Sequence, residues 1–101
     1  MRINKIAMVP FGMVTVILYG DLKRRSGTDK LEIGIDEKPL IEILKQISER
    51  LGISNLIFRE GKVRGELLIL VDGADWNSLG LLDKPVKNDS TIKLIPIWHG
   101  G

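Results

Sequence analysis

The sequence predicts an α+β domain in which a mixed β-sheet is crossed by one long helix. Runs rich in β-branched residues near both ends of the chain favour strands, and one strongly amphipathic segment between them favours a helix. The length of 101 residues suits a single domain with one modest hydrophobic core. We expect the order strand, strand, helix, strand, short helix, strand.

The first two strands are expected to pair as a hairpin. Residues 13–19 (MVTVILY) are apolar enough for a central strand that is covered on both faces. Residues 30–35 (KLEIGI) alternate strictly, which is typical of a half-buried strand. Between them, residues 20–29 (GDLKRRSGTD) carry glycines and charges and are expected to form a turn or exposed loop. Residues 1–12 are expected to be an N-terminal extension or edge strand, because a proline and a glycine interrupt them.

Residues 36–52 (DEKPLIEILKQISERLG) form the clearest predicted helix. Asp36 is a plausible cap, Pro39 suits the first turn, and Gly52 suits the position that closes the helix. The apolar stripe with a period of 3.6 residues consists of Leu40, Ile41, Leu44, Ile47 and Leu51. Ile43 falls off this stripe and is expected to be partly exposed.

The C-terminal third contains two further predicted strands. Residues 66–71 (ELLILV) are almost continuously apolar, which predicts a strand buried on both faces, and Asp72-Gly73 is a turn signal. The next stretch has apolar residues at helical spacing but also a glycine and a proline, so we expect a short helical turn there. Residues 91–97 (TIKLIPI) form the last predicted strand.

The composition gives no set of residues for independent catalysis, and we do not expect an enzyme. The sequence has no cysteine, which excludes a disulfide framework and a thiolate nucleophile. Its one histidine, His99, is two residues from the end, a poor place for a base that needs a buried orienting group. No Gly-rich phosphate-binding motif is present. Asp72, Asp75 and Asp83 fit turn chemistry better than a calcium loop, so no metal site is expected.

Two short basic clusters and a net charge of +2 leave the choice of partner open. Neither cluster is interleaved with aromatic residues, so solvated loops are favoured over direct nucleic-acid binding, and a contact to an acidic partner or RNA is the alternative. The clusters are Lys23, Arg24 and Arg25, and Arg59, Lys62 and Arg64. The apolar run near the N-terminus is too short and interrupted to span a bilayer, and we expect a cytoplasmic protein without membrane contact.

The sequence ends in IPIWHGG, and residues 98–101 are expected to form a flexible tail. A terminal carboxylate at Gly101 is ionised at neutral pH and becomes a good electrophile only after activation, for example as an acyl-adenylate. Gly100 has no side chain, so the tail is slim enough for a narrow channel in a partner. Fully extended, four residues span about 13 Å. The alternative is an idle, disordered tail.

Apolar residues accompany the predicted tail. Ile95, Ile97 and Trp98 are candidates for a partner-binding patch around the tail exit. Alternatively, Ile95 and Trp98 simply fold into the core.

The order of elements and the terminal Gly-Gly resemble the ubiquitin-like β-grasp sulfur carriers. Residues 67–101 (LLILVDGADWNSLGLLDKPVKNDSTIKLIPIWHGG) resemble the C-terminal third of the eukaryotic ubiquitin-related modifier, and residues 22–33 (LKRRSGTDKLEI) resemble a hairpin loop of the molybdopterin synthase small subunit. The wider family includes thiamine-biosynthesis sulfur carriers and archaeal small modifier proteins. The resemblance implies a β-grasp domain over residues 13–97.

The resemblance also implies a chemistry for the tail. Gly101 would be adenylated by an E1-like enzyme, with ATP and Mg²⁺ supplied by that partner, and then converted to a thiocarboxylate. The sulfur donor would be a persulfide of a rhodanese or a cysteine desulfurase. Gly100 would keep the tail slim, and His99 matches the family by type with no catalytic role implied. The protein would thus be a co-substrate of its partners and bind no cofactor of its own.

Three functions follow from this resemblance. The first is sulfur delivery for tRNA thiolation by a tRNA thiolase, with protein conjugation as a further role. The second is the small subunit of molybdopterin synthase, bound to a large subunit. Pro96 stands alone where that family has two prolines, which weakens this assignment. The third is a ubiquitin-like binding module with an idle tail.

Overall fold

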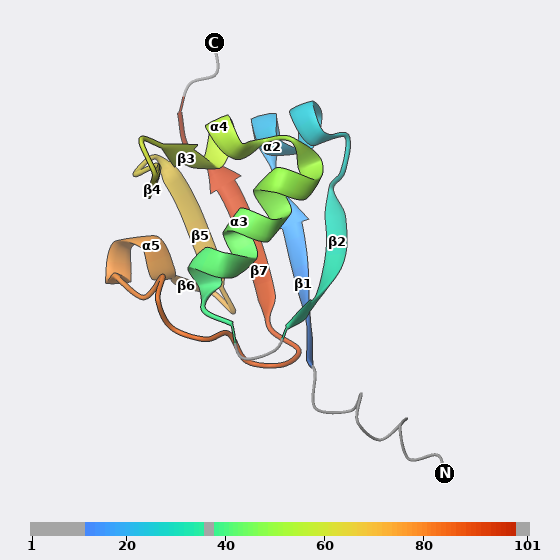
Figure 1. Ribbon diagram of the computed structural model, residues 1–101, viewed down its shortest axis with the longest axis vertical. Coiled ribbons are helices and arrows are strands. Elements are labelled where there is room, and N and C mark those ends of the chain that lie inside the picture. Colours follow the sequence, from blue (N-terminus) through green and yellow to red (C-terminus); the bar gives the residue numbers. More distant parts are fainter. Residues whose placement is uncertain (1–11, 36–37, 99–101) are drawn as a thin grey trace.

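The computed structural model describes residues 12–35 and 38–98 of the chain (Figure 1). The helices and strands follow one another as β1 Gly12–Leu18, α2 Gly20–Ser26, β2 Lys30–Ile35, α3 Leu40–Leu51, α4 Ser54–Ile57, β3 Phe58–Arg59, β4 Lys62–Val63, β5 Leu67–Val71, β6 Ala74–Asp75, α5 Trp76–Leu79 and β7 Thr91–Pro96. The predicted order of the main elements is confirmed, with short elements added between them.

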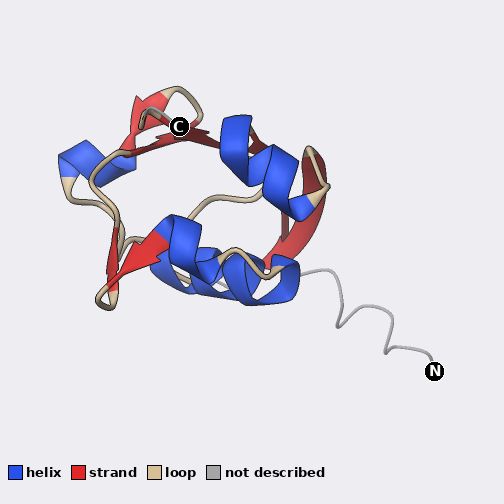
Figure 2. Ribbon diagram, turned by 90° about the horizontal axis from the view of Figure 1, so that it is seen from above, coloured by secondary structure: helices blue, strands red, loops and turns tan. Residues whose placement is uncertain are grey.

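A five-stranded mixed sheet in the order β2-β1-β7-β5-β6 forms one layer, and α3 crosses one of its faces (Figures 1 and 2). The pair β1–β7 is parallel, and the pairs β1–β2, β5–β7 and β5–β6 are antiparallel. The predicted hairpin of the first two strands is confirmed. Because β1 and β7 are parallel neighbours, their C-terminal ends lie at the same end of the sheet.

Within residues 12–35 and 38–98, only one face of the sheet is fully buried. Along β1 the buried residues Val14, Val16 and Leu18 alternate with partly exposed ones, and β5 alternates in the same way. The expectation that residues 13–19 and 66–71 are covered on both faces is therefore wrong. The physical reason is that α3 supplies the second layer on one side only, so alternate side chains turn to the outer face.

Helix α3 packs its apolar residues against the sheet. Ile43 is fully buried, which corrects the expectation of partial exposure. It lies three residues after Leu40 and four before Ile47, so it belongs to the same buried face. The helix begins after Pro39, which occupies the N-cap position rather than the first turn, whereas Asp36 lies outside the described residues. Gly52 closes the helix with a φ of 69°, as predicted.

Residues 20–26 form the helix α2, which corrects the expectation of a loop. Gly20 has a φ of 56° and turns the chain out of β1, while Gly27, with a φ of 72°, closes the helix by donating its N–H to the Lys23 carbonyl oxygen at 2.9 Å. Leu22 is completely buried and anchors the helix to the core. One buried residue in seven gives no periodicity, which explains why the pattern did not predict this helix.

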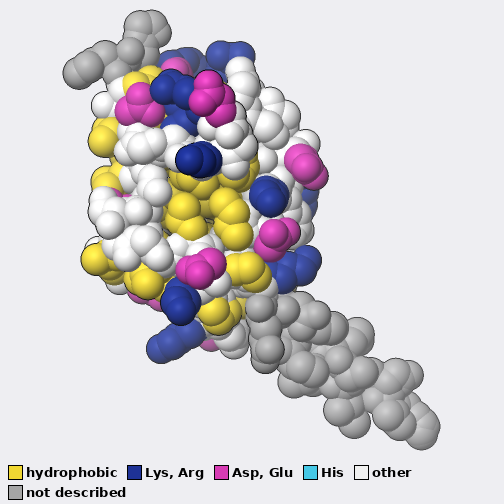
Figure 3. Space-filling view, turned by 60° about the vertical axis from the view of Figure 1, so that its left-hand side comes forward, with side chains coloured by type: hydrophobic (Ala, Val, Ile, Leu, Met, Phe, Trp, Pro, Cys, Tyr) yellow, Lys and Arg dark blue, Asp and Glu magenta, His cyan; other side chains and the backbone are white. Residues whose placement is uncertain are grey.

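A tight turn and a short helix organise the C-terminal half. The predicted turn at Asp72 and Gly73 is confirmed, with φ values of 49° and 94°. The predicted short helical turn is α5, and the Asp75 side chain caps it by accepting a hydrogen bond from the Asn77 N–H at 3.1 Å. Near α5 and the β3–β4 hairpin, hydrophobic side chains reach the surface among charged ones (Figure 3).

Candidate functional site

The candidate site is the place where the chain leaves the sheet after β7. At this end of the sheet, α2 follows β1 and lies beside the end of β7 (Figure 1). The N–H of Tyr19 donates to the Leu94 carbonyl oxygen at 3.1 Å, and the N–H of Ile97 donates to the Glu66 carbonyl oxygen at 2.9 Å. Pairing with the β5 side therefore continues one residue beyond β7, and Trp98 follows directly.

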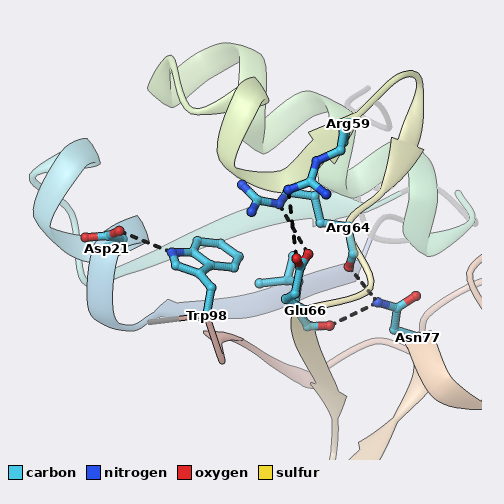
Figure 4. A network of polar contacts seen from close by, with 7 residues as sticks. Asp21, Arg59, Arg64, Glu66, Asn77 and Trp98 are labelled. Carbon is cyan, nitrogen blue, oxygen red and sulfur yellow. Dashed lines mark hydrogen bonds and ion pairs between the residues drawn. The ribbon is translucent and has the colours of Figure 1, made fainter. Parts of the chain in front are cut away.

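Trp98 is held on two sides by elements that are distant in the sequence (Figure 4). Its indole Nε1–H donates to Oδ2 of Asp21 on α2 at 3.2 Å. The guanidinium carbon of Arg64 lies 4.3 Å from the centroid of the ring, within the range of a cation–π contact. The side chain is partly buried and packs against the core. We call the three residues Asp21, Arg64 and Trp98 the clamp.

Arg64 is oriented by an acidic neighbour. Its Nε lies 3.5 Å from Oε1 of Glu66, and Nη2 of Arg59 lies 3.8 Å from the other carboxylate oxygen. The backbone N–H of Glu66, followed by the charges of Arg59 and Arg64, lowers the pKa of the Glu66 carboxyl despite some desolvation. Glu66 is thus ionised at neutral pH and sets the position of the guanidinium. The contact between Arg64 Nε and Glu66 is an ion pair and not a hydrogen bond, and among the described residues this buried Nε has no hydrogen-bond partner.

The helix α5 fixes the backbone that carries Arg64. The side-chain amide of Asn77 donates to the carbonyl oxygens of Arg64 and Leu67, at 3.1 and 3.0 Å (Figure 4). Asp75 accepts hydrogen bonds from the Ser78 hydroxyl at 2.6 Å and from two backbone N–H groups. Burial alone would raise the pKa of Asp75, but these hydrogen bonds outweigh it and lower the pKa. The Asp-Trp-Asn stretch is therefore a brace for the chain segment before β5.

Asp21 is held in a similar way on the other side. It forms an ion pair with Arg24 one turn later in α2, and its side chain is only 17% exposed. A shallow hollow of about 180 Å³ lies beside the clamp and is lined by Gly20, Asp21, Arg24, Pro96 and Trp98. Asp21 and Arg64 lie on either side of the indole ring, and we call the space between them the slot. Each of these two residues is held by a contact that does not involve Trp98.

The predicted partner-binding residues are brought close together, but they differ in exposure. Ile97 is 57% exposed, Ile95 is partly buried on the outer face of the sheet, and the Trp98 ring is engaged by the clamp. Trp98 thus packs against the core, one of the two alternatives for this residue. His99, Gly100 and Gly101 lie outside the described residues, and the roles assigned to them stay predictions.

The outer face of the sheet next to this exit is largely apolar. Ile95 pairs with Leu68 across β5–β7, and Lys93 pairs with Leu70 on one side and Ile17 on the other. All five side chains are partly exposed, and they lie on the face opposite to α3. Ile97 extends this apolar surface to the exit of the C-terminal segment. We call it the outer apolar face.

Sequence reasoning missed Asp21, Arg64 and Asn77 as parts of the site. Arg64 was noticed only as a member of a basic cluster, and Asp21 lay in a segment expected to be a loop. In the described ranges, no three His, Cys, Asp or Glu residues are grouped to hold a metal ion. No helix among the described residues is long and apolar enough to cross a membrane.

Individual relatives, rather than a family model, place the chain in a family. No family model matches the chain. The ubiquitin-related modifier 1 homolog of Drosophila willistoni is 34% identical over 91 residues, which cover 84% of each chain. The small archaeal modifier protein 1 of Methanosarcina acetivorans superposes with a TM-score of 0.74 at 25% identity, over 90% of this chain and 98% of that chain.

A third match is a chain in the complex of BexX and CysO from Amycolatopsis orientalis. The TM-score is 0.70 and the identity 26%, over 87% of this chain and 99% of that chain. These matches confirm both the fold and the resemblance predicted from the sequence. Given the identity and coverage of the Drosophila relative, the chain belongs to the ubiquitin-related modifier 1 family and has its ubiquitin-like β-grasp fold.

Proposed function

We propose that the protein is a ubiquitin-like sulfur carrier whose reactive group is the α-carboxyl of Gly101. The observation that carries this proposal is the position of Trp98, the last described residue, which Asp21 and Arg64 hold at the end of the sheet in a chain of the ubiquitin-related modifier 1 family. His99, Gly100 and Gly101 follow Trp98 in the sequence. Fully extended, three residues reach about 10 Å, so the partner's reactive centre must approach within that distance of the clamp.

The proposed chemistry begins with activation of a poor electrophile. A carboxylate oxygen of Gly101 attacks the α-phosphorus of ATP, pyrophosphate leaves, and an acyl-adenylate forms. An E1-like partner supplies ATP, Mg²⁺ and the catalytic groups. The terminal sulfur of a persulfide, carried by a rhodanese or a cysteine desulfurase, then attacks the carbonyl carbon and AMP leaves. Cleavage of the remaining S–S bond by a thiol releases the thiocarboxylate and a disulfide.

The outer apolar face is the proposed docking surface for the E1-like partner. It is continuous with the exit of the C-terminal segment through Ile95 and Ile97, so a partner that receives the segment meets this face. The complex that contains CysO supports the proposal that a chain of this fold acts together with another protein. In this arrangement the protein is a co-substrate, and catalysis resides in the partner.

Membership of the ubiquitin-related modifier 1 family favours tRNA thiolation as the destination of the sulfur. Conjugation of the activated carboxyl to a protein amine uses the same acyl-adenylate and is a second outcome of the same activation step. The molybdopterin synthase assignment is less favoured, because Pro96 is a single proline before the Gly-Gly segment and the curated relative carries the modifier name.

The experiment is intact mass measurement after incubation with the E1-like enzyme of the same organism, ATP, Mg²⁺, a persulfide donor and a thiol. The mass should rise by the difference between one sulfur and one oxygen atom. A chain that lacks Gly100 and Gly101 is the matched control and should show no change. An unchanged mass with a partner that visibly hydrolyses ATP to AMP would contradict the sulfur-carrier role. Survival of the cellular function after the deletion would instead favour a binding module.

A further inference from the structure

We propose that Trp98 is a positioning residue: held in a preformed slot between Asp21 and Arg64, it fixes the root of the C-terminal segment and sets the reach of Gly101. This inference rests on the proposed function, because it concerns how the segment is presented to the activating partner. It assigns a role to a contact that lies outside the outer apolar face and involves no residue of the Gly-Gly pair.

The main chain alone does not fix the position of Trp98. The last described backbone hydrogen bond along this edge is the one from Ile97 to Glu66. Beyond it, the position of Trp98 rests on its side chain, through the indole hydrogen bond and the contact with Arg64. Without these two contacts, the chain available to extend into a partner would begin one residue earlier and gain about 3.3 Å of reach.

The slot is built independently of the indole ring. Asp21 pairs with Arg24, Arg64 pairs with Glu66, and the Arg64 carbonyl is held by Asn77. Each wall thus has a support of its own, and removal of the ring leaves these supports in place. A preformed slot lowers the entropy that the segment must lose when it enters a partner's channel.

Loss of the contacts that hold Trp98 should therefore slow the adenylation of Gly101 rather than weaken docking of the protein on its partner. In Trp98→Ala, one more backbone residue must be ordered on entry, which corresponds to roughly a 5- to 30-fold lower rate. The loss is expected in kcat of adenylation, followed by ATP–pyrophosphate exchange, because the outer apolar face is unchanged. Trp98→Phe keeps the ring over Arg64 but loses the N–H, and should fall between Trp98→Ala and the unaltered chain.

A length test separates positioning from a merely structural role. Deletion of His99 shortens the chain between Trp98 and the carboxyl of Gly101 by about 3.3 Å and should strongly reduce kcat. In the Trp98→Ala background the same deletion should cost much less, because the released residue 98 restores the lost reach. A structural role would instead lower the folded fraction, raise the apparent KM and make the two effects additive. The matched control is Leu51→Ala, at a partly buried core-packing residue at the end of α3 that is not part of the clamp or its supports, with unchanged exchange expected.

The clamp itself is tested in the free protein by NMR. In Asp21→Asn the indole N–H resonance of Trp98 should move, while that of Trp76 serves as the reference and stays in place. Additive effects in the length test, or an unchanged kcat in Trp98→Ala, would overturn the positioning role. If the unaltered chain supports no exchange although the Trp98 resonance responds to Asp21→Asn, the proposed function fails and the activation role falls with it.

Discussion

The indole Nε1–H of Trp98 donates a hydrogen bond to Oδ2 of Asp21, 3.2 Å away, and so joins two residues 77 positions apart in the sequence. This bond ties the end of the last strand to the helix that follows the first strand. It is possible because β1 and β7 are parallel neighbours, which brings both chain segments to one end of the sheet. The place where the chain leaves the sheet after β7 is thus fixed by a tertiary contact with α2.

Replacement of Asp21 should measure how much this bond contributes to stability. Asp21→Ala removes the acceptor of the indole N–H and the partner of Arg24, and should lower the free energy of unfolding by about 1–3 kcal/mol. Urea denaturation followed by circular dichroism gives the value. Asp29→Ala, at an exposed position just after the same helix, is the control and should change stability by less than about 0.5 kcal/mol. Equal effects of the two substitutions would contradict a stabilising contact at Asp21.

Gly20 should resist substitution for two independent reasons. Its φ of 56° is strained for any residue with a Cβ, and an added Cβ would lie 3.1 Å from Cγ of Pro96. Gly20→Ala is therefore expected to cost about 1–2 kcal/mol, measured as a shift of the thermal or urea midpoint. Gly65→Ala is the matched control, because its φ is not positive and no atom lies within 4 Å of the added Cβ. A stability of Gly20→Ala that matches Gly65→Ala would refute the strain argument.

Asn77 should contribute more to the free energy of unfolding than its position on a four-residue helix indicates. Its amide donates to the carbonyl oxygens of Arg64 and Leu67, so Asn77→Ala leaves two acceptors without these partners. We expect a loss of about 1–3 kcal/mol and a change in the fluorescence of Trp98, because the backbone under Arg64 loosens. Asn55→Ala, at an exposed asparagine of α4, should have no comparable effect. If the two variants unfold at the same urea concentration, the proposed brace is wrong.

The sequence predicted those parts of the fold that leave a local pattern. The period of α3, the left-handed Gly52 and the Asp72-Gly73 turn each depend on residues a few positions apart. The helix α2 left only one weak signal, Gly27 seven residues after Gly20. The clamp left none, because Asp21, Arg64 and Trp98 meet only through strand pairing. Nothing local in the sequence indicates that an aspartate and a tryptophan at opposite ends of the chain are in contact.

The stability of the β5–β6 hairpin should depend on pH through Asp72. The Thr91 N–H donates to its carboxylate at 2.9 Å, and this hydrogen bond, followed by one from Ser90, lowers the pKa of Asp72 below the ordinary 3.8. A carboxyl with a lowered pKa contributes stability that is fully present above the unfolded pKa and is lost as the pH falls through the folded pKa.

Asp72→Asn keeps a side-chain oxygen and tolerates the φ of 49°, but it does not titrate. The unaltered chain should therefore exceed Asp72→Asn in stability by a constant amount above about pH 5, and this difference should shrink below about pH 4. Urea denaturation at several pH values measures the difference, and a difference independent of pH down to about pH 2 would show that the carboxylate is not stabilised in the folded protein.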